Sequence, residues 1–320
     1  MCVVFSVEPC GPRMSRRPER IAGVADVDCS AKTVLVTGST SGIGRAAALA
    51  LGRLGADVVV HGRSAAAGRS VVEELSGMGV EATFVAADFA DVDAVRRLAD
   101  TVRAETEGLD ALVNNAGGLF RQGELTDVGV EYTFHVNHLA PYLLTAELLG
   151  HLREGARVVT TASEAHRGVS LDLDRVTDVA NHSGTWAYGH SKLANVLFAA
   201  ELARRLDAAG REVTSNSLHP GAIPGSGFSR SLPGPLPRVV QALDALPGVT
   251  SVADGAAEIL FLAASPRTAD VSGRYFADRR STTPSSAARD RAAARRLWRE
   301  SAAMLDVEVP LAAATTPSRG

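Results

Sequence analysis

The sequence predicts a single α/β domain in which helices cover both faces of a parallel sheet. Short apolar runs of strand character recur along the chain and alternate with stretches of helical composition. These runs are continuous rather than alternating, which is typical of strands buried on both faces. With 320 residues, 46% of them hydrophobic, the chain is long enough to bury one large core. Because crossovers between parallel strands are right-handed, the predicted architecture is a Rossmann-type doubly wound sheet.

The predicted elements follow one another from residue 33 onward. The expected strands cover residues 33–37, 57–61, 82–87, 109–113, 156–161, 213–218 and 273–277. The expected helices lie near residues 43–54, 65–76, 92–106, 125–149, 187–209, 252–264 and 286–304. Since no linker divides this series, we expect one domain over residues 31–280.

Both ends of the chain and one internal stretch depart from this rhythm. Residues 1–30 lack apolar periodicity and predict a flexible extension, whose removal should leave fold and activity intact; Met14 is an alternative start. Residues 222–250 contain five prolines among glycines and apolar residues, which predicts an inserted substrate lid. Residues 281–320 are expected to form a C-terminal helix and, after Val309, a disordered tail.

Composition and charge narrow the class of protein. The net charge of -3, without a broad basic excess, argues against nucleic acid as the main partner. Cys2, Cys10 and Cys29 all precede the first predicted strand and have no zinc-site spacing, which fits a reducing cytoplasm. The apolar run at the N-terminus is far shorter than the ~20 residues of a membrane helix, so we expect no membrane anchor. A small molecule is the expected partner, and a homo-oligomer is left open.

A glycine-rich turn follows the first predicted strand and opens the first helix. It reads TGSTSGIG over residues 37–44. Glycine lets the backbone turn sharply and approach a pyrophosphate closely, and the helix N-terminus offers unpaired N–H groups to the phosphates. The candidate dinucleotide-binding residues of this turn are Gly38, Ser41, Gly42, Ile43 and Gly44.

Further motifs follow in an order that resembles one family. The turn is similar to the TGxxxGIG motif of short-chain dehydrogenases/reductases, and its spacing differs from the common G-x-G-x-x-G. The fourth predicted strand ends in NNAG at residues 114–117, and YGHSK at residues 188–192 matches YxxxK. The match covers about residues 32–280, and the stretches SEAHRG and YGHSKLANVLF resemble the retinol-dehydrogenase-like branch.

The resemblance implies an NADP(H)-dependent oxidoreductase that interconverts a carbonyl and an alcohol. The catalytic residues that it implies are Ser163, Tyr188, Lys192 and Asn137. The cofactor contacts that it implies beyond the glycine-rich turn are Asn115, Ala116, Gly117, Tyr188, Lys192, Pro220 and Gly221. Ser226 is the candidate replacement for the threonine that the family often has after its Pro-Gly pair.

Elementary chemistry supports roles for the tyrosine and the lysine. Tyr188 and Lys192 are four residues apart in a helical stretch, so both side chains project from one face. A free tyrosine has a pKa of ~10, but a nearby ammonium favours the phenolate and lowers that pKa. Tyr188 would then act as general acid in reduction and general base in oxidation. By resemblance, Lys192 also binds the nicotinamide ribose, Ser163 bonds the substrate oxygen, and Asn137 supports a water-mediated proton relay.

The end of the second predicted strand indicates which nicotinamide cofactor binds. An acidic residue there would bind the ribose 2′-hydroxyl of NAD, but the strand ends in His61-Gly62-Arg63. The planar guanidinium of Arg63 suits a 2′-phosphate, and Arg45 at the start of the first helix is a second candidate. Asp88 resembles the family's adenine contact, although acidic residues are also common at helix N-termini. The expected cofactor is therefore NADP(H).

The substrate and the alternatives to this function follow from the remaining features. The apolar composition of residues 222–250 predicts a bulky, mainly apolar ketone or aldehyde. Within the same chemistry, a tailoring ketoreductase of natural-product biosynthesis, such as that of polyketides, is an alternative. A non-catalytic NADP-binding sensor or scaffold and an extended-type epimerase or dehydratase are others; the last usually carries TGxxGxxG, which does not match. His135 and His138 have the spacing of a metal pair, but no third ligand is evident, and no metal is expected.

Overall fold

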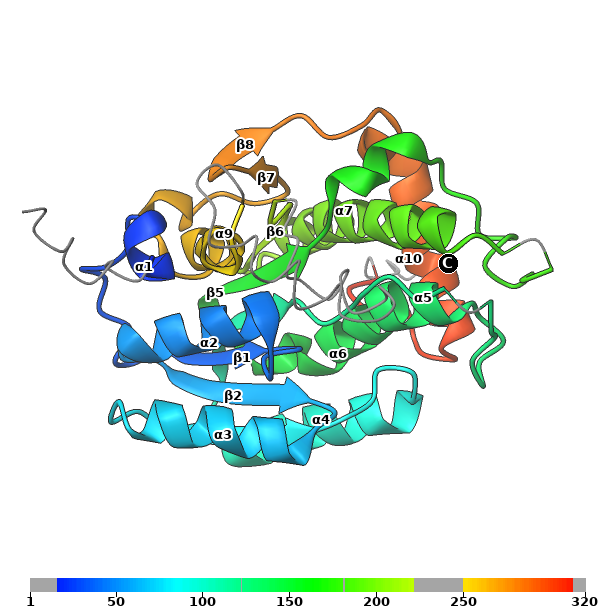
Figure 1. Cartoon of the computed structure of the whole chain (residues 1–320). Coiled ribbons are helices and arrows are strands. Elements are labelled where there is room, and N and C mark those ends of the chain that lie inside the picture. Colours follow the sequence, from blue (N-terminus) through cyan, green and yellow to red (C-terminus); the bar gives the residue numbers. More distant parts are fainter. Residues whose placement is uncertain (1–15, 122, 181, 222–249, 313–320) are drawn as a thin grey trace, which may run out of the picture.

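The computed structural model describes residues 16–121, 123–180, 182–221 and 250–312, and its centre is one eight-stranded sheet (Figure 1). The strand order is β3-β2-β1-β4-β5-β6-β7-β8. The strands are β1 (Thr33–Val36), β2 (Asp57–Gly62), β3 (Ala82–Ala86), β4 (Leu109–Asn114), β5 (Leu152–Thr161), β6 (Thr214–Leu218), β7 (Tyr275–Ala277) and β8 (Arg280–Thr282). All neighbouring pairs are parallel except β7 and β8, which are antiparallel. The predicted doubly wound fold is confirmed, with one additional edge strand.

Helices pack on both faces of the sheet and enclose two apolar cores. One core is shared by α2 (Gly42–Arg53), α3 (Ala65–Ser76) and α9 (Val252–Ala264). The other is shared by α4 (Val92–Glu105), α6 (Ala140–Leu148), α7 (Gly184–Ala208) and α10 (Arg291–Met304). In β1, Val34 and Val36 belong to the first core and Leu35 to the second. Successive strand residues point to opposite faces, so a strand between two cores must be apolar throughout.

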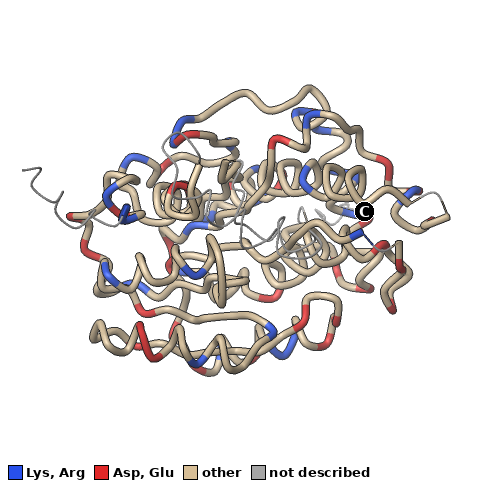
Figure 2. Tube along the Cα trace, viewed as in Figure 1, with Lys and Arg blue, Asp and Glu red and all other residues tan. Residues whose placement is uncertain are grey.

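The strand order places a crevice at the centre of the sheet. From β1 the chain winds toward β2 and β3, whereas from β4 it winds toward β5 and β6. The loops that leave the carboxyl ends of β1 and β4 therefore separate, and ligands of doubly wound sheets bind in the gap between them. Figure 2 shows acidic and basic residues interspersed along the described part of the trace.

Residues 16–30 correct the prediction of a flexible N-terminal extension. They include α1 (Pro18–Ile21), which packs on α2 and α9. Glu19 is only 4% exposed, and its carboxylate accepts two hydrogen bonds of 2.9 Å from the Arg53 guanidinium. Val24 and Cys29 are buried in the core beside α2. Truncation at residue 30 would leave Arg53 unpaired and uncover apolar surface, so it should destabilise the fold; residues 1–15 lie outside the described residues.

The helix predicted over residues 125–149 starts later than expected. Gly129 has a φ of 70°, a left-handed conformation that interrupts a right-handed helix. The Glu131 carboxylate then accepts hydrogen bonds from two backbone N–H groups and caps α5 (Tyr132–Phe134). A π-helical turn, His135–Leu139, joins α5 to α6.

The C-terminal part also differs from the prediction. A tight turn at Asp278 and Arg279, with φ of 50° and 57°, returns the chain from β7 to form the unexpected β8. After α10, the Trp298 indole donates to the Pro310 carbonyl and the Arg205 guanidinium donates to the Leu311 carbonyl, each at 3.1 Å. The predicted disorder after Val309 is thus wrong as far as residue 312. Residues 313–320 and 222–249, with the predicted lid and Ser226, lie outside the described residues.

Each helix that the structure describes is too short or too polar to cross a lipid bilayer.

Candidate active site

A cavity of about 250 Å³ lies at the carboxyl ends of the central strands. It brings together the following residues predicted from the sequence: Gly38, Ser41, Gly42, Ile43, Gly44, Arg63, Asp88, Asn115, Ala116, Gly117, Ser163, Tyr188, Lys192, Pro220 and Gly221. Asn137 does not line the cavity and lies fully buried behind it. Segments far apart in sequence therefore meet at one site, as expected for the edge of a doubly wound sheet.

The glycine-rich turn is held by contacts that leave no space for larger residues. A Cβ on Gly38, whose φ is 65°, would lie 2.9 Å from Ala116 Cα, and one on Gly44 would lie 2.4 Å from the Gly38 carbonyl oxygen. The Gly38 N–H donates to Nδ1 of the buried His61, whose Nε2 lies 3.2 Å from the Ala87 carbonyl oxygen. Burial lowers the pKa of His61 to about 4, so the ring is neutral and can accept from Gly38. Sequence reasoning missed this role, and its only signal was a histidine where NAD-binding sheets carry an acid.

Thr37 fastens the glycine-rich turn to the loop after β4. Its hydroxyl donates to the Val113 carbonyl at 3.0 Å and accepts from the N–H groups of Asn115 and Ala116. The Asn115 side-chain amide returns a 2.9 Å hydrogen bond to the Thr37 carbonyl. The two loops that border the crevice are thereby fixed relative to one another.

The candidate 2′-phosphate residue lies at the end of β2. Arg63 Nη1 is 3.8 Å from an Asp88 carboxylate oxygen, and the Arg63 side chain is 65% exposed, so this guanidinium is accessible. The other Asp88 oxygen accepts from the Ala90 N–H at 3.1 Å, which favours its loop-capping role while leaving the adenine contact a prediction. Arg45, the second candidate, is ion-paired with Glu74 and does not line the cavity.

Tyr188 and Ser163 contact each other in the cavity lining. The half-buried phenol is hydrogen-bonded to the Ser163 side chain, whose Oγ also accepts from the Ala165 N–H at 3.3 Å. Desolvation raises the pKa of Tyr188, and the bond to Ser163 acts in the opposite direction. The sequence-based expectation that the neighbouring ammonium would lower this pKa is not met, because burial dominates.

Lys192 lies behind the tyrosine in a closed environment. Its Nζ donates to the Thr161 carbonyl at 3.0 Å and is 5.6 Å from the centroid of the Tyr188 ring. The same carbonyl accepts a 3.1 Å hydrogen bond from the side chain of Asn195. Lys192 is 4% exposed, and burial lowers its pKa to about 8. The ammonium can therefore lose its proton within an ordinary assay range.

Asn137 connects the NNAG loop to the helix of the tyrosine. Its Oδ1 accepts from the Gly118 N–H, while its Nδ2 donates to the Gly118 carbonyl and to Ser191 Oγ, each at 2.9 Å. Ser191 Oγ in turn donates to the Tyr188 carbonyl at 2.8 Å. Through these hydrogen bonds, Asn137 connects the loop at Gly118 to the start of α7, which carries Tyr188. Its part in a proton relay stays a prediction.

The two histidines that flank Asn137 are occupied by other contacts. His135 Nδ1 lies 2.7 Å from the Thr126 hydroxyl, and His138 Nε2 lies 2.9 Å from the Ser301 hydroxyl. Over the described ranges, no three histidine, cysteine or acidic side chains are grouped as a metal site would require.

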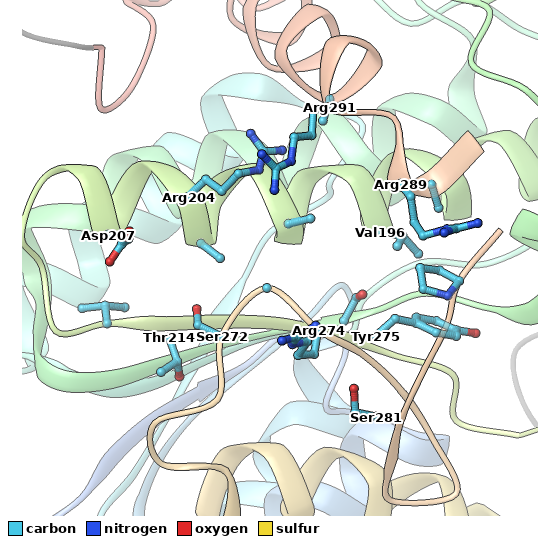
Figure 3. A pocket seen from close by; sticks show the side chains of 18 of the residues that line it. Val196, Arg204, Asp207, Thr214, Ser272, Arg274, Tyr275, Ser281, Arg289 and Arg291 are labelled. Carbon is cyan, nitrogen blue, oxygen red and sulfur yellow. The ribbon is translucent and has the colours of Figure 1, made fainter. Parts of the chain in front are cut away.

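A larger cavity, of about 1130 Å³, lies between α7, β6, the β7–β8 hairpin and the start of α10 (Figure 3). Arginines and acids line it together, among them Arg204, Arg274, Arg291 and Asp207. It contains none of the catalytic candidates and no glycine-rich turn, so the smaller cavity is the candidate active site.

A dinucleotide-type turn beside a tyrosine and a buried lysine one helical turn apart defines the class of a nicotinamide-dependent oxidoreductase. The family model described as short chain dehydrogenase matches residues 32–232. The chain belongs to the short-chain dehydrogenase family.

Comparisons with known proteins place the chain in the retinol-dehydrogenase-like branch. It is 38% identical over 274 residues to a protein named as a daunorubicin C-13 ketoreductase of Streptomyces sp. (strain C5), covering 85% of this chain and 92% of that protein. It is 36% identical to human retinol dehydrogenase 13, covering 87% and 86% of the two chains.

Solved structures with bound cofactor resemble the structure of this chain. A short chain dehydrogenase from Burkholderia cenocepacia J2315 in complex with NADP is 30% identical, with a TM-score of 0.62 over 82% of this chain and 99% of that one. The landomycin C-6 ketoreductase LanV, solved with NADP and rabelomycin, is 29% identical, with a TM-score of 0.60 over 79% and 96%.

Proposed function

We propose that this protein is an NADP(H)-dependent oxidoreductase that interconverts a bulky, mainly apolar ketone or aldehyde and its alcohol. The proposed catalytic residues are Ser163, Tyr188, Lys192 and Asn137. The observation that carries the proposal is the convergence of Ser163, Tyr188 and Lys192 with the glycine-rich turn in one cavity. A non-catalytic sensor would not need this set, and an epimerase usually carries a different glycine pattern.

The charges around the cavity favour a substrate without a carboxylate. Of the described lining residues, Arg63 is the single arginine, and it lies beside Asp88 and Tyr132, at the end of β2. Lys192 is buried and bonded to Thr161, so it is not available to pair with a substrate acid. Among the described lining residues, a small keto acid would therefore lack the cation that usually recognises it.

NADPH supplies the hydride when it is bound. In the proposed reduction, Ser163 orients the carbonyl oxygen, and Tyr188 donates the proton that this oxygen receives as the alcohol forms. The raised pKa of Tyr188 keeps the phenol protonated at neutral pH, as a proton donor requires. After this proton transfer, the Lys192 ammonium behind the ring places positive charge close to the Tyr188 phenolate and stabilises it.

The tailoring ketoreductase is a second candidate within the same chemistry. Two of the similar proteins are named as ketoreductases for daunorubicin and landomycin, and LanV was solved with rabelomycin. Others are named as retinol dehydrogenases and a polyprenol dehydrogenase. All these names refer to bulky organic molecules, which supports the proposed substrate class.

A carbonyl series followed by NADPH absorbance tests the proposal. The series runs from pyruvate through decanal and retinal to anthracycline and angucycline ketones. We expect kcat/KM to rise with apolar size by roughly 100-fold or more, because each buried methylene contributes about 0.8 kcal/mol. Highest efficiency on a polycyclic polyketide ketone would select the tailoring role, whereas preference for pyruvate would refute the substrate class. NADPH binding without turnover on any member would favour a sensor.

Cofactor choice can be tested at Arg63. We expect Arg63→Ala to weaken NADPH binding by about 1.5–3 kcal/mol, the value of a charge-assisted hydrogen bond, and to leave NADH binding nearly unchanged. Fluorescence titration of the wild type and the variant gives the dissociation constants for NADPH and NADH, and the ratio of the two constants measures cofactor preference.

Arg45→Ala is the matched control, because that arginine is paired with Glu74 outside the cavity. Arg45→Ala should leave the ratio of the NADPH dissociation constant to the NADH dissociation constant unchanged. Equal losses for both cofactors in Arg63→Ala would show that Arg63 does not bind the 2′-phosphate.

A further inference from the structure

His166 is a buried histidine that the proposed mechanism does not use. It lies in the short 3-10 helix Glu164–Gly168, which begins directly after Ser163, and its side chain is 0% exposed. Both ring nitrogens have a backbone partner: Nδ1 lies 2.6 Å from the Ser163 carbonyl oxygen, and Nε2 lies 3.1 Å from the Ser285 backbone nitrogen. The ring therefore connects Ser163 with a segment more than a hundred residues away in sequence.

These partners determine where the ring proton resides. The Ser285 N–H can only donate, so His166 Nε2 must accept, and Nδ1 must carry the proton and donate to the Ser163 carbonyl. Burial lowers the pKa of His166, which favours this neutral form. A protonated ring would turn an Nε2–H toward the Ser285 N–H and break that bond.

The surroundings hold the ring in place. The Tyr275 ring makes an edge contact with His166 at 5.0 Å between centroids, and the Tyr275 hydroxyl donates to the Glu164 carboxylate at 2.8 Å. The Arg167 guanidinium bonds the same carboxylate and also donates to the Thr283 carbonyl at 3.0 Å. Figure 3 shows Tyr275 at the wall of the neighbouring large cavity, so His166 is packed between that wall and the active site.

We propose that His166 is a positioning residue that fixes the backbone of Ser163, and hence its hydroxyl, by anchoring the Ser163 carbonyl to the segment 283–285. The inference rests on the proposed function, since it assigns His166 an effect through Ser163. Ser163 Oγ bonds both Tyr188 and the Ala165 N–H, so a shift of this backbone would move the hydroxyl away from the phenol.

Two substitutions each remove one of the two hydrogen bonds of the His166 ring. In His166→Asn the side-chain amide nitrogen can occupy the place of Nδ1 and keep the donor to Ser163, but the acceptor for Ser285 is lost. In His166→Gln the amide oxygen can occupy the place of Nε2 and keep Ser285, but the donor to Ser163 is lost. We expect kcat to fall by roughly 10-fold or more in His166→Gln and by less than about 3-fold in His166→Asn, with NADPH affinity unchanged in both.

The pH dependence of alcohol oxidation supplies a readout that a structural role would not move. The bond from Ser163 lowers the pKa of Tyr188, which must be deprotonated for oxidation, so the ascending limb of the pH profile should shift to higher pH in His166→Gln and stay in place in His166→Asn. Equal losses in the two variants, or no loss in His166→Gln, would overturn the inference.

Two further measurements complete the test. In a Ser163→Ala background, His166→Gln should cause no further loss of kcat. If Ser163→Ala alone retains full activity, the proposed catalytic role of Ser163 is wrong, and the failure is then distinct from a failure of the His166 inference. Nitrogen NMR of the histidine-labelled wild-type protein, assigned with His166→Asn, should show a neutral ring protonated at Nδ1. An Nε2-protonated ring would contradict the inference even if His166→Gln did not fold.

Discussion

Tyr188→Phe is expected to lower kcat by at least ~100-fold, the usual cost of a lost general acid. The substitution removes only the phenol oxygen, which donates the proton in the proposed reduction, and keeps the ring that packs in the cavity. NADPH affinity should change by less than about 2-fold, because the proposed cofactor contacts of the turn and of Lys192 remain. Steady-state kinetics with the best carbonyl of the series and NADPH fluorescence titration measure the two quantities separately.

Tyr132→Phe is a matched control in the same cavity. Its hydroxyl contacts Arg63 rather than Ser163, so its loss should leave kcat within roughly 3-fold of the wild type. A Tyr188→Phe enzyme that retained more than about a tenth of the wild-type rate would exclude Tyr188 as the proton donor.

Local patterns were sufficient to predict the parallel sheet. Continuous apolar runs such as Val34–Val36 identify strands between two cores, and the bounds of α3 match the predicted helix 65–76. The predicted helix 125–149 failed in its first part because Gly129 and the cap at Glu131 break it, although the apolar residues on either side suit a helix. Backbone conformation at a single glycine was not evident from composition.

Contacts between distant residues could not be predicted from the sequence. The burial of Glu19 depends on Arg53, which belongs to another helix, so residues 16–30 lacked a local signal of order. The edge strand β8 depends on two residues with left-handed backbone, Asp278 and Arg279, neither of which is glycine. The first feature depends on a contact between two helices, and the second on a local backbone conformation that the residue types do not mark.

The candidate site shows the same division. Its motifs could be located because each follows a strand, and the carboxyl ends of parallel strands share one edge. His61 lies outside the motifs, and Asn195 lies within YGHSKLANVLF without a role assigned from the sequence. Their importance comes from the Gly38 N–H and the Thr161 carbonyl that they bind. The pKa of Tyr188 was predicted in the wrong direction, since spacing shows the nearby ammonium but not how far the ring is withdrawn from water.

The lysine is expected to produce a distinctive pH dependence. Burial lowers the pKa of Lys192 to about 8, so its ammonium is present below that pH and is lost above it. If the ammonium stabilises the phenolate and binds the ribose, kcat/KM for reduction should decline as pH rises through about 8. A flat profile from pH 7 to ~9 would indicate that the charge is not required.

Lys192→Met should then reduce kcat/KM by at least ~100-fold and weaken NADPH binding by roughly 10-fold, while the fold remains intact. Stability should not decrease at neutral pH. The folded-state pKa of about 8 lies below the ordinary lysine value, so the buried ammonium destabilises the native state below pH 8, and methionine removes that cost. The Thr161 carbonyl keeps its hydrogen bond from Asn195. Thermal melts at pH 7 should therefore give an equal or higher Tm, with the difference shrinking as pH rises from about 8 toward ~10.4. A lower Tm with the same kinetic loss would instead assign Lys192 a structural role.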